Sequence, residues 1–161
     1  MRIFNNGGVS PVTVANYLLK KDLTAGTTAM DQMKLIKLVY MCHGRHLAEF
    51  GVPLVNELAE AWKYGPIFIS IYTQTKDKGE TPLTELLADS SGDKLTHAQK
   101  ELADRVYADY GTFHGVDLML RSHARGTPWY RVYIEQGRQY FPISNRLIKA
   151  HYKEMLNAQY A

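Results

Sequence analysis

The sequence predicts a mainly α-helical protein that folds as one compact multi-helix domain around a long central helix. Apolar residues recur at helical spacing in several segments, and residues that favour helix ends stand beside those segments. The 161 residues, 45% of them hydrophobic and 22% charged, are enough for one core of ordinary globular composition. We therefore expect residues 1–161 to form a single domain.

The first helix is predicted to begin at Ser10-Pro11, because serine is a favoured N-cap and proline suits the first helical position. Apolar residues at helical spacing continue this helix to about Lys21. The longest helix follows at about residues 28–50, where apolar side chains cover most of the circumference. A helix of that kind is largely enclosed by other elements, so we expect it at the centre of the fold.

The ends of this long helix are marked by residues with known capping preferences. Thr28 or Asp31 is predicted to cap its start, and Gly51 to end it in the left-handed conformation that glycine tolerates. Lys34 and Lys37 are expected on the remaining polar strip of its surface.

A Gly-Pro pair is predicted to form a corner between two short helices. A helix through residues 57–62 should stop at Gly65, and a new helix should run over residues 66–75. Trp62 and Tyr64 would then pack beside the corner. Because both aromatics carry a polar tip, they could serve packing, line a pocket, or do both.

The second half of the chain alternates helices with polar connections. Residues 76–95 are rich in turn-forming residues, so we expect a loop there, interrupted at most by a brief helix. Residues 131–142 could form a short β-hairpin or a loop, and the sequence leaves both open. Capping residues and apolar spacing predict the remaining helices over residues 96–110, from Val116 to about Ala124, from Thr127-Pro128 onward and from Ser144 onward.

Composition and charge disfavour several classes of protein. A lone cysteine, Cys42, excludes an intramolecular disulfide, and its apolar surroundings should raise its pKa. The N-terminus lacks the apolar core of a signal peptide, and the longest apolar run is too short to span a bilayer, so we expect a soluble, cytoplasmic protein. The net charge of +3 is not concentrated in a basic stripe, which makes nucleic-acid binding unlikely on sequence grounds.

Two histidines near the end of the long helix raise the alternative of a metal-dependent enzyme. His43, His46 and Glu49 follow one another at steps of three residues, so they could partly share a helix face. A metal would need neutral imidazoles, a further ligand and supporting hydrogen bonds, none of which this spacing supplies. We favour a partly solvated helix end at this place and predict no bound metal.

A hydrolase is the other enzymatic alternative. Ser122, His123 and Asp117 include the residue types of a hydrolytic triad, but adjacent residues on a helix point about 100° apart. Phosphate-binding glycine loops and the zinc-helix motif are missing, so no cofactor is predicted. A DNA-binding regulator stays as a further alternative, although neither candidate second helix gathers the side chains that read bases.

Several short motifs, taken in order, resemble one known family. They are Met33-Lys34-Leu35-Ile36-Lys37-Leu38-Val39-Tyr40, Pro53-Leu54, Glu60-Ala61-Trp62-Lys63-Tyr64-Gly65-Pro66-Ile67, Ser122-His123 and Pro128-Trp129. This set resembles the Panacea domain of SocA-like antitoxins, and the correspondence runs from about Val14 to about Tyr152. The resemblance implies that the chain is one Panacea-like domain and not an enzyme.

Members of that family, often carried on phages and prophages, are encoded beside diverse toxins. The resemblance therefore implies a cognate protein toxin as the partner and neutralisation by direct protein–protein binding. One branch resembles a proteolytic adaptor that delivers its toxin to a ClpXP-type protease, so both routes stay open here. Where the family commonly has an acidic residue after Thr-His, this chain has Ala124 after Ser122-His123, which puts any role of that acid in doubt.

The motif residues could either fix the fold or form the toxin interface. This applies to Trp62, Tyr64, Gly65, Pro66, His123, Pro128 and Trp129. We favour a core role for the two tryptophans, because motifs shared by relatives with many different partners suit a fold better than one interface. Partner contacts are then expected on ordinary surface, such as the 76–95 loop or Arg121, Arg125 and Arg131. If Trp62 is fully buried, its replacement by alanine should destabilise the fold by about 3–5 kcal/mol.

Overall fold

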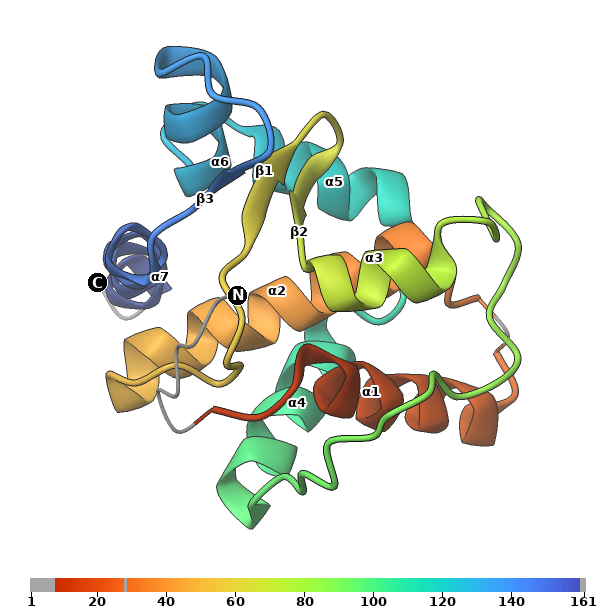
Figure 1. Cartoon of the computed structure of the whole chain (residues 1–161). Helices are drawn as coiled ribbons and strands as arrows, with labels where there is room; N and C mark the ends of the chain where they lie inside the picture. Colours follow the sequence, from red (N-terminus) through yellow and green to blue (C-terminus); the bar gives the residue numbers. More distant parts are fainter. Residues whose placement is uncertain (1–7, 28, 160–161) are drawn as a thin grey trace.

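One long helix, α2 (Gln32–Phe50), lies at the centre of the molecule, with the other helices and a small sheet packed around it (Figure 1). The computed structural model describes residues 8–27 and 29–159. Within these residues there are seven α-helices and a three-stranded antiparallel sheet, so the predicted mainly α-helical fold is confirmed. The other helices are α1 (Pro11–Ala25), α3 (Ile69–Thr75), α4 (His97–Tyr110), α5 (Gly115–His123), α6 (Pro128–Tyr130) and α7 (Asn145–Gln159).

Capping residues fix the helix boundaries largely as predicted. The Asp31 carboxylate accepts a hydrogen bond from the backbone N–H of Lys34 at the start of α2, and Gly51 ends α2 with a φ of 78°. Thr28, the alternative cap, lies outside the described residues. Helix α1 begins at Pro11 as expected but continues to Ala25, four residues beyond the predicted end.

The Gly-Pro corner is a β-hairpin, and the prediction of two short helices there is wrong. Strand β1 (Glu60–Trp62) pairs with β2 (Gly65–Ile67), with Trp62 opposite Gly65. Gly65 has a φ of 106°, which only glycine adopts readily, and this lets the chain reverse within two residues. Pro66 is tolerated because β2 is an edge strand of the sheet. Helix α3 starts only at Ile69.

Residues 131–142 do not form a hairpin with each other. The side chain of Thr127 caps the start of α6, and the helical backbone does not stop at Tyr130. It continues as a π-helical turn over Arg131–Glu135. Phe141–Pro142 form strand β3, which pairs with β1 (Figure 1). The sheet order β2-β1-β3 therefore joins two segments far apart in the sequence.

The two lysines of α2 are buried, and the prediction of a polar strip is wrong. Lys34 and Lys37 each keep only 3% of their surface exposed. The Lys34 ammonium donates to the backbone carbonyl of Gly111, and the Lys37 ammonium donates to the carbonyl of Pro66 at 3.0 Å. Elements pack on every side of α2, so these side chains reach backbone acceptors in place of water.

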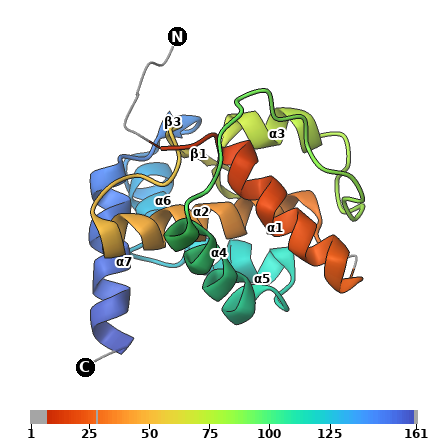
Figure 2. The ribbon, with the colours of Figure 1, turned by 90° about the horizontal axis from the view of Figure 1, so that it is seen from below.

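Residues 76–95 form an extended strap that crosses α1 on the way from α3 to α4 (Figure 2). The predicted brief helix is absent from this strap as the structure describes it. The side-chain amide of Asn16 bonds both the N–H and the carbonyl of Leu87, and Thr13 donates to the carboxylate of Asp89. These contacts fix the strap to α1. In the described parts of the chain, no helix combines the length and apolar character needed to cross a membrane.

Candidate functional site

The motif residues come together where the hairpin meets α5 and α6. We name this cluster of Trp62, Gly65, Pro66, His123 and Trp129 the motif junction. The indole N–H of Trp129 donates to the backbone carbonyl of Trp62 at 2.6 Å, and Trp129 is only 4% exposed. Its ring stacks on His123 with the centroids 3.8 Å apart and the planes at 8°. The junction thus joins segments more than sixty residues apart by a hydrogen bond and a ring stack.

Trp62 differs from Trp129 because it is only partly buried. Its ring lies between those of Tyr72 and Tyr140, with centroid distances of 4.7 Å and 4.9 Å. Its indole N–H donates to the Glu60 carboxylate at 3.3 Å. Tyr64 stands at the tip of the hairpin and is 55% exposed. The outer face of the hairpin is therefore aromatic and accessible, and a hollow of about 270 Å³ beside it is lined in part by Trp62, Tyr64 and Tyr140.

A buried amine lies under the hairpin. Burial lowers the pKa of Lys37 from its ordinary 10.5 to about 7. A Cβ at Gly65 would lie 2.7 Å from the Ser122 hydroxyl and 2.8 Å from the Cε of Lys37, so only glycine fits over this lysine. In the sequence, Lys37 stands between two apolar residues, Ile36 and Leu38, and this pattern is the local indication that its amine could be buried.

The Ser122 and His123 side chains are not arranged as a nucleophile and its base. The Ser122 hydroxyl donates to the backbone carbonyl of Met119 at 2.7 Å. Burial, and then the charge of nearby Lys37, lower the pKa of His123, so the imidazole is neutral near pH 7. Its Nε2 atom is buried and bonds no other described residue. His123 therefore serves the junction through its stack on Trp129.

The candidate metal ligands on α2 are held apart by protein partners. His43 is fully buried, with Nε2 donating to the Asn145 side-chain oxygen at 2.8 Å and burial lowering its pKa to about 4. His46 donates from Nδ1 to the carbonyl of Val52, and Glu49 accepts both guanidinium N–H groups of Arg105. Both histidines are buried, while the end of α2 is partly solvated as expected, with Phe50 48% exposed. Within residues 8–27 and 29–159, no group of three potential ligands could hold a metal.

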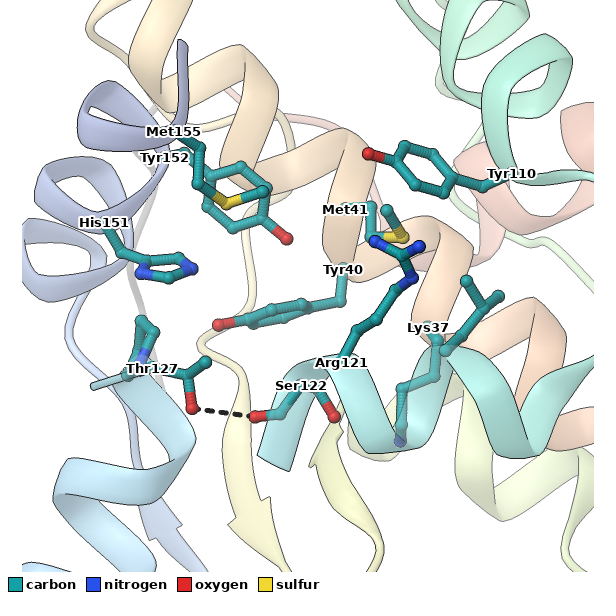
Figure 3. A pocket seen from close by; sticks show the side chains of 12 residues that line it. Lys37, Tyr40, Met41, Tyr110, Arg121, Ser122, Thr127, His151, Tyr152 and Met155 are labelled. Carbon is teal, nitrogen blue, oxygen red and sulfur yellow. Dashed lines mark hydrogen bonds between the residues drawn. The ribbon is translucent and has the colours of Figure 1, made fainter. Parts of the chain in front are cut away.

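The three candidate partner-contact arginines occupy different places. Arg125, in the loop after α5, and Arg131, in the π-helical turn, are exposed. Arg121, on α5, is also exposed, and it lines a pocket between α2, α5 and α7 (Figure 3). Its guanidinium lies over the rings of Phe113 and Tyr110, with distances of 4.8 Å and 5.6 Å to the ring centroids.

This pocket has a volume of about 60 Å³, and we name it the α2–α5–α7 pocket. Figure 3 shows the hydroxyls of Tyr110 and Tyr152 and the guanidinium of Arg121 directed toward its middle. Its wall is completed by Lys37, Tyr40, Met41, Leu118, Ser122, Thr127, Pro128, His151 and Met155. Lys37, Tyr40, Ser122 and Pro128 of the lining belong to the motifs, but Tyr110, Arg121, His151 and Tyr152 do not. These four residues lie on three different helices, α4, α5 and α7, so no local pattern in the sequence points to the pocket.

Two comparisons with known proteins identify relatives. Residues 35–130, which include α2 from Leu35 onward, the hairpin and α5, match the family described as "Antitoxin SocA-like, Panacea domain". The protein "Antitoxin SocA" of Caulobacter vibrioides (strain NA1000 / CB15N) is 32% identical over 128 residues. That alignment covers 72% of this chain and 66% of the relative, so the chain spans just under two thirds of the relative's length. No solved structure matches.

Proposed function

Because the chain belongs to the SocA-like antitoxin family with a Panacea domain, we propose that it neutralises a cognate protein toxin in the cytoplasm by binding it directly. The observation that carries this proposal is the family match, which spans residues 35–130. That range holds the whole hairpin, α5 and all of the motif junction, so the likeness covers the structural centre of the molecule and not a peripheral segment.

The surface offers the kind of side chains that anchor protein interfaces. Such anchors are enriched in Trp, Tyr and Arg and are surrounded by polar residues. Tyr64 and Tyr140 are 55% and 63% exposed on the outer face of the hairpin, and the ammonium of Lys63 lies 5.3 Å from the ring centroid of Tyr64. Arg121 supplies a further anchor at the α2–α5–α7 pocket. These groups support a binding role and require no catalytic step.

Co-expression with the adjacent gene tests the proposal. The product of that gene alone should arrest growth, and the antitoxin should restore growth and co-purify with it. The control is the toxin expressed with an empty vector in place of the antitoxin, which should leave growth arrested. If neither neighbouring product is toxic, or if rescue occurs without any complex between the two proteins, neutralisation by direct binding is wrong.

A more specific version of the proposal is that the antitoxin delivers the toxin to a ClpXP-type protease. An adaptor would shorten the lifetime of the toxin, whereas a masking antitoxin would leave the toxin abundant and inactive. The half-life of the toxin, followed after translation is stopped in cells with and without ClpX, separates the two. Masking predicts equal half-lives in both strains. A toxin that is stabilised and lethal only without ClpX would instead establish delivery.

A further inference from the structure

The α2–α5–α7 pocket carries a group of donors that lack an acceptor, and we propose that it binds a carboxylate, the side chain of an Asp or Glu of the toxin. This inference rests on the proposed function, because the carboxylate belongs to the partner. The proposed contact centres on Arg121 and Tyr152, which lie outside the family motifs.

The charge of the pocket is one-sided. Lys37, Arg121 and His151 line it, with burial lowering the pKa of both Lys37 and His151, and no Asp or Glu is among its described lining residues. Arg121 forms no ion pair with any residue in the described ranges; its guanidinium contacts only the faces of two aromatic rings. The Lys37 ammonium is turned toward Pro66. Arg121 is therefore the cation left to meet an incoming anion.

Two buried tyrosines add hydroxyl donors. Tyr40 and Tyr152 are 4% and 8% exposed, yet neither hydroxyl bonds another described residue, and both side chains line the pocket (Figure 3). Burial raises the pKa of both phenols, so both hydroxyls keep their protons at neutral pH. Neither hydroxyl is both fully buried and unpaired, so each can donate to a group that enters the pocket, and a carboxylate accepts several hydrogen bonds at once. A carboxylate therefore fits these donors better than a neutral amide or a second cation.

The donors are held in place by close packing. A Cβ at Gly44 of α2 would lie 2.2 Å from the ring of Tyr152, so this ring sits directly against the helix backbone. The rings of Tyr40 and Tyr152 meet edge to face, with centroids 6.2 Å apart and planes at 67°. Fixed donors bind an anion without first losing conformational freedom, which makes each contact more effective.

The size of the pocket favours a side chain over a larger ligand. A volume of about 60 Å³ holds only about four water molecules, if each needs roughly 15 Å³. A carboxylate fits in that space, while a nucleoside does not. Carboxylate recognition by a guanidinium is also strong and directional, because two parallel N–H groups can meet the two oxygens.

Binding measurements on paired variants test the carboxylate contact. Arg121→Ala should raise the Kd of the purified complex with the toxin by about ten- to a hundredfold, the effect of losing a charged hydrogen-bond partner. Tyr152→Phe, which removes only the hydroxyl, should raise it by about two- to tenfold. The controls Arg146→Ala and Tyr133→Phe remove the same groups outside the pocket and should leave the Kd unchanged. Thermal unfolding of each variant verifies that it is folded.

A charge reversal identifies the partner's residue. Arg121→Glu should abolish binding, and one Asp→Arg or Glu→Arg substitution in the toxin should restore it. If the wild-type chain binds the toxin and Arg121→Ala and Tyr152→Phe bind it equally well, the pocket proposal is wrong while the antitoxin proposal stands. If the wild-type chain binds no toxin, the antitoxin proposal itself fails. Inorganic phosphate or ATP that binds the free antitoxin in an Arg121-dependent way would also overturn the assignment to a partner carboxylate.

Discussion

The motif junction and the α2–α5–α7 pocket meet at α5 residues 121–123 and differ in how their donor groups are used. In the junction, the indole N–H groups of Trp62 and Trp129 both have protein acceptors, whereas the buried Nε2 atom of His123 bonds no other described residue. In the pocket, the guanidinium of Arg121 and the hydroxyls of Tyr40 and Tyr152 bond none of the described residues. The indole donors of the junction are satisfied within the chain, whereas the pocket keeps donors that a partner can use.

This difference indicates which motif residues stabilise the fold and which residues are available to bind a partner. Indole N–H groups that already have acceptors within the chain gain nothing from a partner, and the cluster loses stability when one of the tryptophans changes. We propose that the residues of the motif junction hold the hairpin to α5 and α6, and that recognition depends on Arg121 and Tyr152, which lie outside the motifs. Changes in the junction should then mainly affect folding, and changes in the pocket should mainly affect binding.

Trp129→Ala should destabilise the fold by about 3–5 kcal/mol, because it removes a buried ring stack and the hydrogen bond to Trp62. Trp62→Ala should have a smaller effect, about 1–3 kcal/mol, since Trp62 is only partly buried. Urea unfolding of both variants measures the two free energies. Equal losses, or a larger loss for Trp62, would contradict the assignment of Trp129 as the main attachment of the junction.

Gly65→Ala should destabilise the fold by about 2–4 kcal/mol, through positive φ and through close contacts with Lys37 and Ser122. Gly126→Ala is the matched control, since Gly126 has a φ of 89° but nothing lies within 4 Å of an added Cβ. The difference between their unfolding free energies isolates the contacts over Lys37. If the two variants are equally stable, the hairpin does not depend on close approach at Gly65.

Lys37 should make stability rise with pH. Its folded pKa of about 7 lies below its ordinary 10.5, so the unfolded chain binds more protons between these values and stability increases with pH across that window. The slope should approach about 1.4 kcal/mol per pH unit above pH ~8. Lys37→Met should remove this slope. Unfolding free energies of both proteins between about pH 7.5 and about pH 9 provide the comparison, and parallel curves would show that Lys37 is not an unusually acidic amine.

Tyr64→Ala should change the unfolding free energy by less than about 0.5 kcal/mol, because its side chain is largely exposed. Its effect on toxin affinity sharpens the comparison of regions. We expect Tyr64→Ala to weaken binding of the toxin less than Arg121→Ala does, which would keep the α2–α5–α7 pocket as the principal contact. Calorimetric titration of both variants with the toxin measures the two affinities. A larger loss at Tyr64 would move the principal contact to the outer face of the hairpin.

The sequence predicts the helices of this fold better than its sheet. Capping residues such as Asp31, Thr96 and Ser144 act within a few residues, so helix starts are visible locally. Strand β1 has only three residues, and its pairing with Phe141–Pro142 depends on contacts about eighty residues away. Such pairing leaves no local periodicity, and the same three residues are equally compatible with a helix.

The functional region is predictable only in part for a similar reason. The motifs single out Trp62, Gly65 and Trp129 as candidate site residues, and these three residues lie in the same junction of the structure. The burial of Lys37 follows from neighbours on every side of α2, which a helical pattern alone does not reveal. Tyr40 and Tyr152 look like ordinary members of apolar stripes. Their unpaired hydroxyls become visible only when α2 and α7 are placed side by side.

The most direct test of the separation between fold and recognition is the Kd for the toxin of two conservative variants, measured at a temperature where both are folded. Trp129→Phe removes a hydrogen bond from the motif junction, and Tyr152→Phe removes a hydroxyl from the pocket. We expect Trp129→Phe to unfold at a lower temperature yet bind with wild-type affinity, and Tyr152→Phe to keep its stability while binding more weakly. Weaker binding by Trp129→Phe together with wild-type binding by Tyr152→Phe would contradict this account.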